Sequence, residues 1–259
     1  MISHSFLRAV SSCPPRMKAS IRYIIPMLIV LDLSTASAAI TIEGTRVIHD
    51  AGRGKDVTVK THNNGEQPAL VQVWIDDGQR DARPENVRAA YQLTPVEPRL
   101  VHPQQSQAYR LTFAPRPGGS SIPTDHESVY YFNLLDIPPK PEGAHDSNIL
   151  QFAVRTRIKV FHRPAGLKGD PRLAASALAW SSGVGRTLDV HNPTPYHVTI
   201  SHLALDDGTS ISADMIAPGE MKRLPIPAAA SPPTTVRFQW IDDYGAVREQ
   251  QAAVIGSTP

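Results

Sequence analysis

Apolar and polar residues alternate in short runs along most of the chain, and turn residues separate the runs. A period of two is typical of strands that bury one face, and no segment shows a 3.6-residue period over ten or more residues. The pattern therefore predicts an all-β protein in which helices are minor. The predicted strands are Ile40–Ile48, Val57–Thr61, Leu70–Ile75, Gln92–Val96, Tyr109–Phe113, Ser128–Leu135, Ile149–Phe161, Thr187–His191, His197–Leu205, Lys222–Ile226 and Val236–Ile241.

The segment Asn148–Val160 has the most regular alternation. Its even positions form an almost unbroken apolar face, and its odd positions include Gln151, Arg155, Arg157 and Lys159. An ordinary half-buried strand explains this pattern. An edge strand that offers apolar side chains and free backbone groups to a partner explains it as well.

Two halves of the chain resemble each other weakly. The segment Arg163-Pro164-Ala165-Gly166 ends the first run of strands. His62-Asn63 in the first half corresponds to His191-Asn192 in the second half. A turn at Pro103 likewise corresponds to a turn at Pro218. Coincidence is one explanation, since Asn and Pro are common in turns. The repeat also agrees with two immunoglobulin-like sandwiches in tandem, which we place at residues 39–163 and 164–259.

The N-terminus has the three parts of a secretory signal peptide. Lys18 and Arg22 precede the apolar run Ile24–Leu33, and Ala36-Ser37-Ala38 follows. We assign residues 1–38 to an upstream extension and signal peptide, with a start at Met1 or Met17 and cleavage near Ala38. The run is short for a bilayer span, so we expect an exported protein without a stable membrane anchor.

Charge and motifs argue against several function classes. Lys and Arg total 26 against 24 Asp and Glu, too balanced for nucleic-acid binding. The sequence lacks a P-loop, a G-x-G-x-x-G and a G-x-S-x-G, so we expect no enzyme and no cofactor. Cleavage would remove Cys13, the only cysteine. The densest histidines, His191, His197 and His202, fit no ligand spacing, and we expect no metal there.

Three carboxylate pairs stand beside turns, at Asp76-Asp77, Asp206-Asp207 and Asp242-Asp243. We interpret them as solvated turn residues, and a calcium site at one of them stays an open alternative.

Three further motifs occur in order: Thr45-Arg46-Val47-Ile48; Glu127–Leu134 followed by Ile137-Pro138-Pro139; and Leu150–Val154 continued by Arg157–Pro164. With them the chain resembles the PapD-like periplasmic chaperones of the chaperone–usher pathway, in the short-loop subfamily. The resemblance implies two immunoglobulin-like β-sandwich domains in an L- or boomerang-shaped arrangement, working in the periplasm. It also implies two partners, namely pilus or fimbrial subunits and an outer-membrane usher.

The resemblance also implies roles for single residues. Arg46 and Lys159 would bind the C-terminal carboxylate of the subunit. Leu150, Phe152 and Val154 would be lent to the subunit in place of its missing strand. Glu127, Arg163 and Asp243 would form an ion network between the domains. Apart from the resemblance, an edge this apolar leaves open whether the free protein caps it by forming a dimer.

Two other function classes remain at this level. One is an exported β-sandwich that binds a ligand or sugar through the Asp-rich turns. The other is a pilus subunit, although subunits carry one incomplete domain and this chain has two apparent domains.

Overall fold

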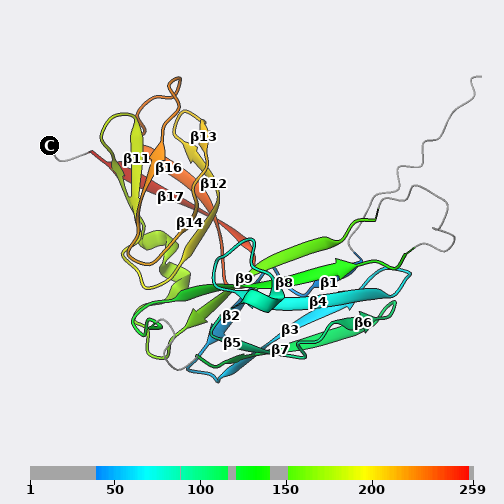
Figure 1. Cartoon of the computed structure of the whole chain (residues 1–259). Helices are drawn as coiled ribbons and strands as arrows, with labels where there is room; N and C mark the ends of the chain where they lie inside the picture. The colour runs from blue at the N-terminus through cyan, green and yellow to red at the C-terminus, as the bar shows by residue number, and fades with distance from the viewer. Residues whose placement is uncertain (1–38, 88, 116–120, 141–150, 257–259) are drawn as a thin grey trace, which may run out of the picture. The chain divides into compact units, whose positions relative to one another are not determined.

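The computed structural model describes residues 39–87, 89–115, 121–140 and 151–256, which belong to one compact unit, Ser37–Pro259 (Figure 1). The predicted signal peptide, both candidate start residues and Cys13 lie outside the described residues. The first sandwich contains β1 (Ile40–Ile42), β2 (Arg46–Asp50), β3 (Asp56–Asn63), β4 (Ala69–Asp76), η1 (Pro84–Asn86), β5 (Tyr91–Thr94), β6 (Arg99–Val101), β7 (Ser106–Phe113), β8 (Ser128–Ile137) and β9 (Val154–Arg163). The second contains η2 (Pro171–Leu173), η3 (Ala175–Ala177), β10 (Ala179–Ser182), β11 (Thr187–His191), β12 (Val198–Leu205), β13 (Ser210–Ile211), β14 (Asp214–Ile216), β15 (Met221–Pro225), β16 (Thr235–Ile241) and β17 (Val247–Ile255).

The first sandwich has two sheets, with strand orders β1-β3-β7-β5 and β2-β9-β8-β4-β6. Apolar residues from the inner faces of both sheets share one core, and the largest fully buried side chains in it include Tyr109, Leu111, Phe132 and Leu134. Alternation along each strand places these residues inside and polar residues outside, as expected for a sandwich.

The chain passes from one sheet to the other at two places in the first sandwich. The predicted strand Ile40–Ile48 is two strands in different sheets, because Gly44 adopts a positive φ of 86° between them. The turn at His62–Gly65 does not form a hairpin, since β3 pairs with β1 and β7 while β4 pairs with β8 and β6. Pleat alternation cannot distinguish a hairpin from a crossing between sheets, because both need a turn.

The second sandwich is formed by one sheet with the order β13-β12-β16-β17-β10-β11-β15, in which β14 also pairs with β12. Parallel pairing of β10 with β17 connects its two halves, and Trp180, Leu188, Leu203 and Phe238 are fully buried in its core. The turn at Asp242–Gly245 forms a hairpin, in which Ile241 pairs with Val247.

One buried asparagine in each sandwich holds equivalent loops together. Nδ2 of Asn63 donates to the carbonyls of Gln67 and Val101, and Nδ2 of Asn192 donates to those of Tyr196 and Ile216. In each case the side-chain oxygen accepts from the backbone N–H two residues later. The internal repeat in the sequence thus corresponds to the same hydrogen-bonded corner in both sandwiches.

A pair of histidines is buried in the first sandwich. His49 and His162 are 2% and 3% exposed, and their Nδ1 atoms lie 3.3 Å apart. Tyr91 Oη lies 2.7 Å from Nδ1 of His49, and the ring of Phe113 stacks on His162 with centroids 3.7 Å apart. Burial, and secondarily the nearby His49, lower the pKa of His162 from 6.5 to about 4.

Candidate functional site

Strand β9 has an edge that is only half covered. One edge pairs along its length with β8, from Val154 opposite Asp136 to His162 opposite Ser128. On the other edge β2 runs parallel to β9 and pairs only with Lys159–Arg163. Among the described residues, no strand covers this edge along residues 154–158, so their outward backbone groups are available for pairing.

The start of β9 differs from the predicted strand Ile149–Phe161. Gln151–Ala153 are irregular, and Asn148, Ile149 and Leu150 lie outside the described residues. The neighbouring strand β8 ends at Ile137 and is followed by two prolines, which lack the N–H groups needed to extend the ladder opposite these residues.

The even face of β9 changes from buried to exposed toward its beginning. Ile158 and Val160 belong to the core of the first sandwich, whereas Val154 is 40% exposed and Phe152 is 62% exposed. Two large apolar side chains therefore lie in solvent beside the uncovered edge. Of the three predicted donor residues, the structure describes these two, because Leu150 lies outside the described residues.

Arg46 and Lys159 lie side by side where β2 meets β9. They are register partners in a parallel pair, so their side chains leave the same face of the sheet. Nη1 of Arg46 donates to the carbonyl of Ile241 at 2.9 Å, while its Nε is buried without a hydrogen-bond partner among the described residues. Lys159 has a side chain that is 23% exposed, and its Nζ lies 3.9 Å from Asp214 Oδ1.

This pair of cations is electrostatically costly. Burial lowers the pKa of both side chains, and the positive charge of Arg46 lowers that of Lys159 further, while Asp214 opposes the effect. Two partly desolvated like charges on adjacent strands are stabilised when an anion binds between them. A carboxylate suits this position because charge-assisted hydrogen bonds contribute about 1.5–3 kcal/mol each.

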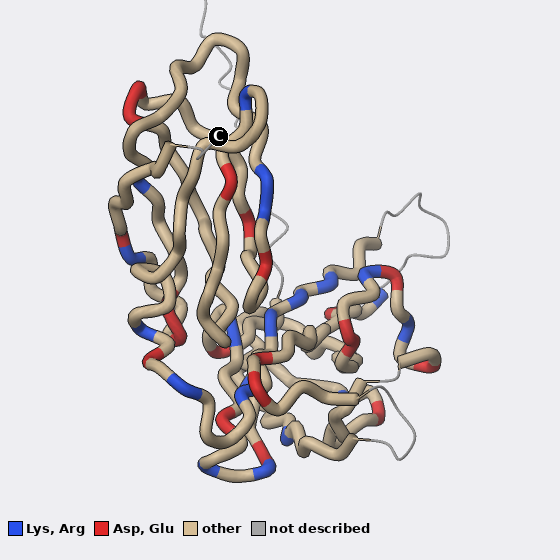
Figure 2. Tube along the Cα trace, turned by 90° about the vertical axis from the view of Figure 1, so that its left-hand side faces the viewer, with Lys and Arg blue, Asp and Glu red and all other residues tan. Residues whose placement is uncertain are grey.

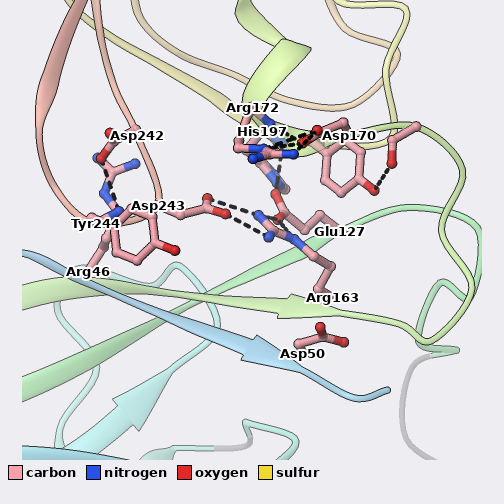
Figure 3. A network of polar contacts seen from close by, with 12 residues as sticks. Arg46, Asp50, Glu127, Arg163, Asp170, Arg172, His197, Asp242, Asp243 and Tyr244 are labelled. Atoms are coloured by element: carbon pink, nitrogen blue, oxygen red, sulfur yellow. Dashed lines mark hydrogen bonds and ion pairs between the residues drawn. The ribbon is translucent and has the colours of Figure 1, made fainter. Parts of the chain in front are cut away.

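Arg163, the last residue of β9, joins the two sandwiches through a network of ion pairs (Figure 3). Its Nε donates to Glu127 Oε1 at 2.7 Å, and its two terminal nitrogens donate to the carboxylate of Asp243 at 2.8 and 3.1 Å. Burial opposes the charged form, but these hydrogen bonds and charges raise the pKa of Arg163. The structure thus brings together all three residues predicted for the network.

His197 extends this network in a way that the sequence did not reveal. Its backbone N–H donates to Glu127 Oε2 at 2.8 Å, and its Nδ1 lies 3.1 Å from the same oxygen. The side chains of Glu127 and His197 are only 1% and 5% exposed. In the sequence, the spacing of His197 from the other histidines served only as an argument against a metal site. Glu127 and His197 are 70 positions apart, and a contact at that separation leaves no local pattern in the sequence.

The odd face of β9 carries a second polar cluster, on the outer surface of the sheet. Nε of Arg157 donates to Asp76 Oδ2 at 3.0 Å, and Nε and Nη2 of Arg155 donate to Asn133 Oδ1 at 3.1 and 2.7 Å. The guanidinium groups also lie over aromatic rings, Arg155 over Trp74 at 4.8 Å and Arg157 over Tyr131 at 3.5 Å.

The interpretation of the carboxylate pairs as solvated is wrong for two residues. Asp76 is fully buried, and Asp242 is 8% exposed. Burial raises the pKa of Asp76, but hydrogen bonds from Arg157 and Asn133 outweigh it, so the pKa falls below its ordinary value. Asp242 accepts hydrogen bonds from the backbone of Tyr244 and Ala246 inside the hairpin turn.

Charges of both signs are interspersed along both sandwiches (Figure 2). Within the described ranges, no three His, Cys, Asp or Glu side chains gather where they could hold a metal ion. A helix long and apolar enough to cross a membrane is likewise not found in these ranges.

Comparisons with known proteins agree over nearly the whole described chain. A family model for the N-terminal domain of the PapD pili and flagellar-assembly chaperones matches residues 39–168, and one for the C-terminal domain of PapD pili assembly chaperones matches residues 173–252. The chaperone protein FimB/FhaD of Bordetella pertussis is 39% identical over 222 residues, covering 85% of this chain and 89% of that protein. The probable fimbrial chaperone YadV of Escherichia coli K12 is 38% identical over 229 residues, covering 85% of this chain and 91% of that protein.

Solved structures confirm the predicted fold class of two β-sandwiches. A crystal structure of a YadV chaperone has a TM-score of 0.69 and 35% identity, covering 83% of this chain and 99% of that one. The Salmonella enterica SafB chaperone, solved with the SafA pilin, has a TM-score of 0.71 over 85% and 98% of the two chains; at 23% identity it supports the fold alone.

Proposed function

Because the chain belongs to the PapD-like family of pilus and fimbrial assembly chaperones, we propose that it captures unfinished pilus or fimbrial subunits in the periplasm and delivers them to an outer-membrane usher. The family consists of assembly chaperones, and the proposed activity is binding without chemical conversion of the subunit. Export would use the predicted signal peptide, cleaved near Ala38.

The observation that carries this proposal is the uncovered edge of β9, which ends beside two cations. A subunit strand that pairs with residues 154–158 would satisfy their backbone groups. Phe152 and Val154 already lie exposed beside this edge, and Leu150 would continue the same alternation. Burying three such side chains contributes roughly 5–9 kcal/mol before the costs of ordering. In the free protein, dimerisation would protect the same edge.

Arg46 and Lys159 would bind the terminal carboxylate of the subunit. The lowered pKa of each cation supports this role, since a bound anion would offset the cost of burying the two positive charges. Because both residues lie at the end of the uncovered segment, the carboxylate would fix how far the subunit strand can advance along β9.

The network of Glu127, Arg163 and Asp243 would have a structural role. Its hydrogen bonds connect the end of β9 with the β16–β17 turn, and a backbone hydrogen bond from Glu127 to the carbonyl of Pro195 lies beside it. We propose that it keeps Arg46 and Lys159 in a fixed position relative to the second sandwich.

Co-expression with a pilus subunit tests the proposal. Lys159→Ala and Arg46→Ala should fold normally but fail to co-purify the subunit, and Phe152→Asp should do the same. Lys60→Ala and Arg110→Ala are matched controls, because these side chains are 65% and 66% exposed on the other sheet of the first sandwich. If Lys159→Ala and Arg46→Ala both retained the subunit at the yield of the controls, the carboxylate-binding role would be wrong.

A further inference from the structure

Asp136 is a buried carboxylate on the inner face of β8, where alternation places apolar side chains such as Phe132 and Leu134. It is only 4% exposed, and it lies in the middle of its sheet, opposite Val71 of β4 and Val154 of β9. Among the described residues, no Lys, Arg or His side chain forms an ion pair with it. A carboxylate is costly at such a position unless a cation or several hydrogen-bond donors reach it.

Two backbone N–H groups at the beginning of the first sandwich bind this carboxylate. The nitrogen of Ala39 donates to Asp136 Oδ2 at 3.0 Å, and the nitrogen of Ile40 donates to the same oxygen at 3.1 Å. The other oxygen, Oδ1, is buried without a hydrogen-bond partner among the described residues. The contact joins the two sheets of the sandwich, because Ile40 begins β1 and Asp136 lies on β8.

Further contacts fix the position of Ala39. Its carbonyl accepts a hydrogen bond from the backbone N–H of Asn64 at 2.8 Å. A Cβ atom added to Gly65 would lie 2.8 Å from the Cβ of Ala39, so only glycine at position 65 leaves room for Ala39. Gly65 is not one of the glycines with a positive φ, and this close approach therefore explains why glycine is needed there.

The predicted signal peptide ends directly before these contacts. Ala36-Ser37-Ala38 has the pattern of a cleavage site, and cleavage after Ala38 makes Ala39 the first residue of the mature chain. Hydrolysis of this peptide bond by water leaves a carboxylate on Ala38 and an ammonium group on Ala39. The nitrogen that lies 3.0 Å from Asp136 Oδ2 then carries a positive charge and three hydrogens in place of one.

We propose that Asp136 binds the α-ammonium group of Ala39 once the signal peptide has been removed, so that cleavage stabilises the first sandwich. The ammonium group neutralises the buried carboxylate and supplies a hydrogen-bond donor for Oδ1. Because Asp136 lies opposite Val154, the ion pair also stabilises the sheet beside the exposed start of β9. The inference rests on the export step of the proposed function and does not depend on subunit binding.

The first residue of the exported protein gives the first test. Intact-mass spectrometry of the protein purified from the periplasm should identify Ala39 as this residue. A different first residue would place no ammonium group beside Asp136 and would overturn the proposal.

Urea unfolding of two matched chains measures the ion pair. One chain begins at Ala39, and the other begins at Ser37, which leaves an uncharged amide at Ala39 and moves the ammonium group two residues away. Both chains can be released from a cleavable fusion, since neither contains a cysteine. The chain that begins at Ala39 should have an unfolding equilibrium constant about tenfold smaller, as expected for one hydrogen bond to a charged group.

A variant of Asp136 shows whether the carboxylate is responsible. Asp136→Asn keeps the shape and one acceptor but removes the negative charge, so the ratio between the two chains should fall below about twofold. Glu43→Gln is the matched control, because Glu43 directly follows β1 and its side chain is 73% exposed. It should keep the full ratio. The two chains are compared first without any substitution, so the test does not depend on whether Asp136→Asn folds.

Equal stability of the two chains, or a ratio that persists in Asp136→Asn, would overturn the ion pair. Neither result bears on subunit capture, which co-purification measures separately. Conversely, loss of the carboxylate-binding role of Arg46 and Lys159 would leave the comparison of the two chains unchanged.

Discussion

Mild acid should destabilise the first sandwich through His162, and the size of the effect can be worked from its surroundings. The unfolded chain binds a proton at this ring near pH 6.5, whereas the folded protein binds it only near pH 4. The contribution to stability is therefore fully present above pH 6.5 and is lost as the pH falls between these two values. Since one pKa unit corresponds to about 1.4 kcal/mol, the complete loss is about 3 kcal/mol.

The structure explains why protonation is resisted. The ring is 3% exposed, stacks on Phe113 and has Nδ1 of His49 as its nearest polar neighbour. Tyr91 also lies within 3.4 Å of His162 Nδ1, and burial raises the pKa of its hydroxyl, so it offers no negative charge. A protonated His162 would face a second histidine without a carboxylate partner among its described contacts.

Equilibrium urea unfolding between about pH 7.5 and about pH 4.5 measures this effect. Over that range the wild-type protein should lose about 2.5 kcal/mol more than His162→Phe or His162→Gln, which cannot be protonated there. Two variants are used because Phe preserves the stacking and Gln preserves the polarity. His202→Gln is the matched control, since His202 is exposed, and it should keep the full dependence on pH.

Equal losses in the wild type and both His162 variants would show that the folded protein protonates this ring without cost. The argument from burial would then be refuted.

Three further predictions concern stability. Arg163→Ala should lower the free energy of unfolding by about 3–5 kcal/mol in chemical denaturation, because it removes the guanidinium that pairs with the buried Glu127 carboxylate; adding Glu127→Ala should recover part of the loss, and full additivity would contradict this. Asn192→Ala should cost at least about 2 kcal/mol in the same assay, since the carbonyls that it bonds stay buried. Gly245→Ala should lower thermal stability by about 1–2 kcal/mol, because φ is +85° and a Cβ would lie 2.5 Å from Thr45 Oγ1; a melt unchanged from wild type would refute the steric argument.

The sequence predicted the strand content and the two sandwiches well, because alternation with a period of two reports directly on burial. It also located the equivalent corners at Asn63 and Asn192, since a turn asparagine between two strands leaves a visible signal. Short strands such as β6, β13 and β14 were missed, because two or three residues are too few to show a period. The four-residue β10 and the nine-residue β17 were missed as well, and β17 has no fully buried residue that would give it an apolar face.

The pairing of strands and the burial of polar groups could not be read from the pattern. Asp76 beside a turn has the signature of a solvated carboxylate, yet Arg157 from a strand 81 residues away covers it. His49 and His162 meet for the same reason, because parallel pairing of β2 with β9 places them opposite each other. Such contacts depend on the order of strands in the sheet, which local alternation does not encode.

The point where β2 joins β9 also fixes the register of any strand that pairs with the uncovered edge. β2 occupies the edge from Lys159 onward, so a guest strand can fill only the places before it. The position of each residue of the guest strand along β9 is then set by its distance in sequence from the last residue of the guest. Removing one residue near its C-terminus would exchange its inward and outward side chains along the whole shared edge, whereas removing two would leave the faces unchanged. Even and odd truncations of the same subunit should therefore bind with an alternating rather than a gradual loss of affinity.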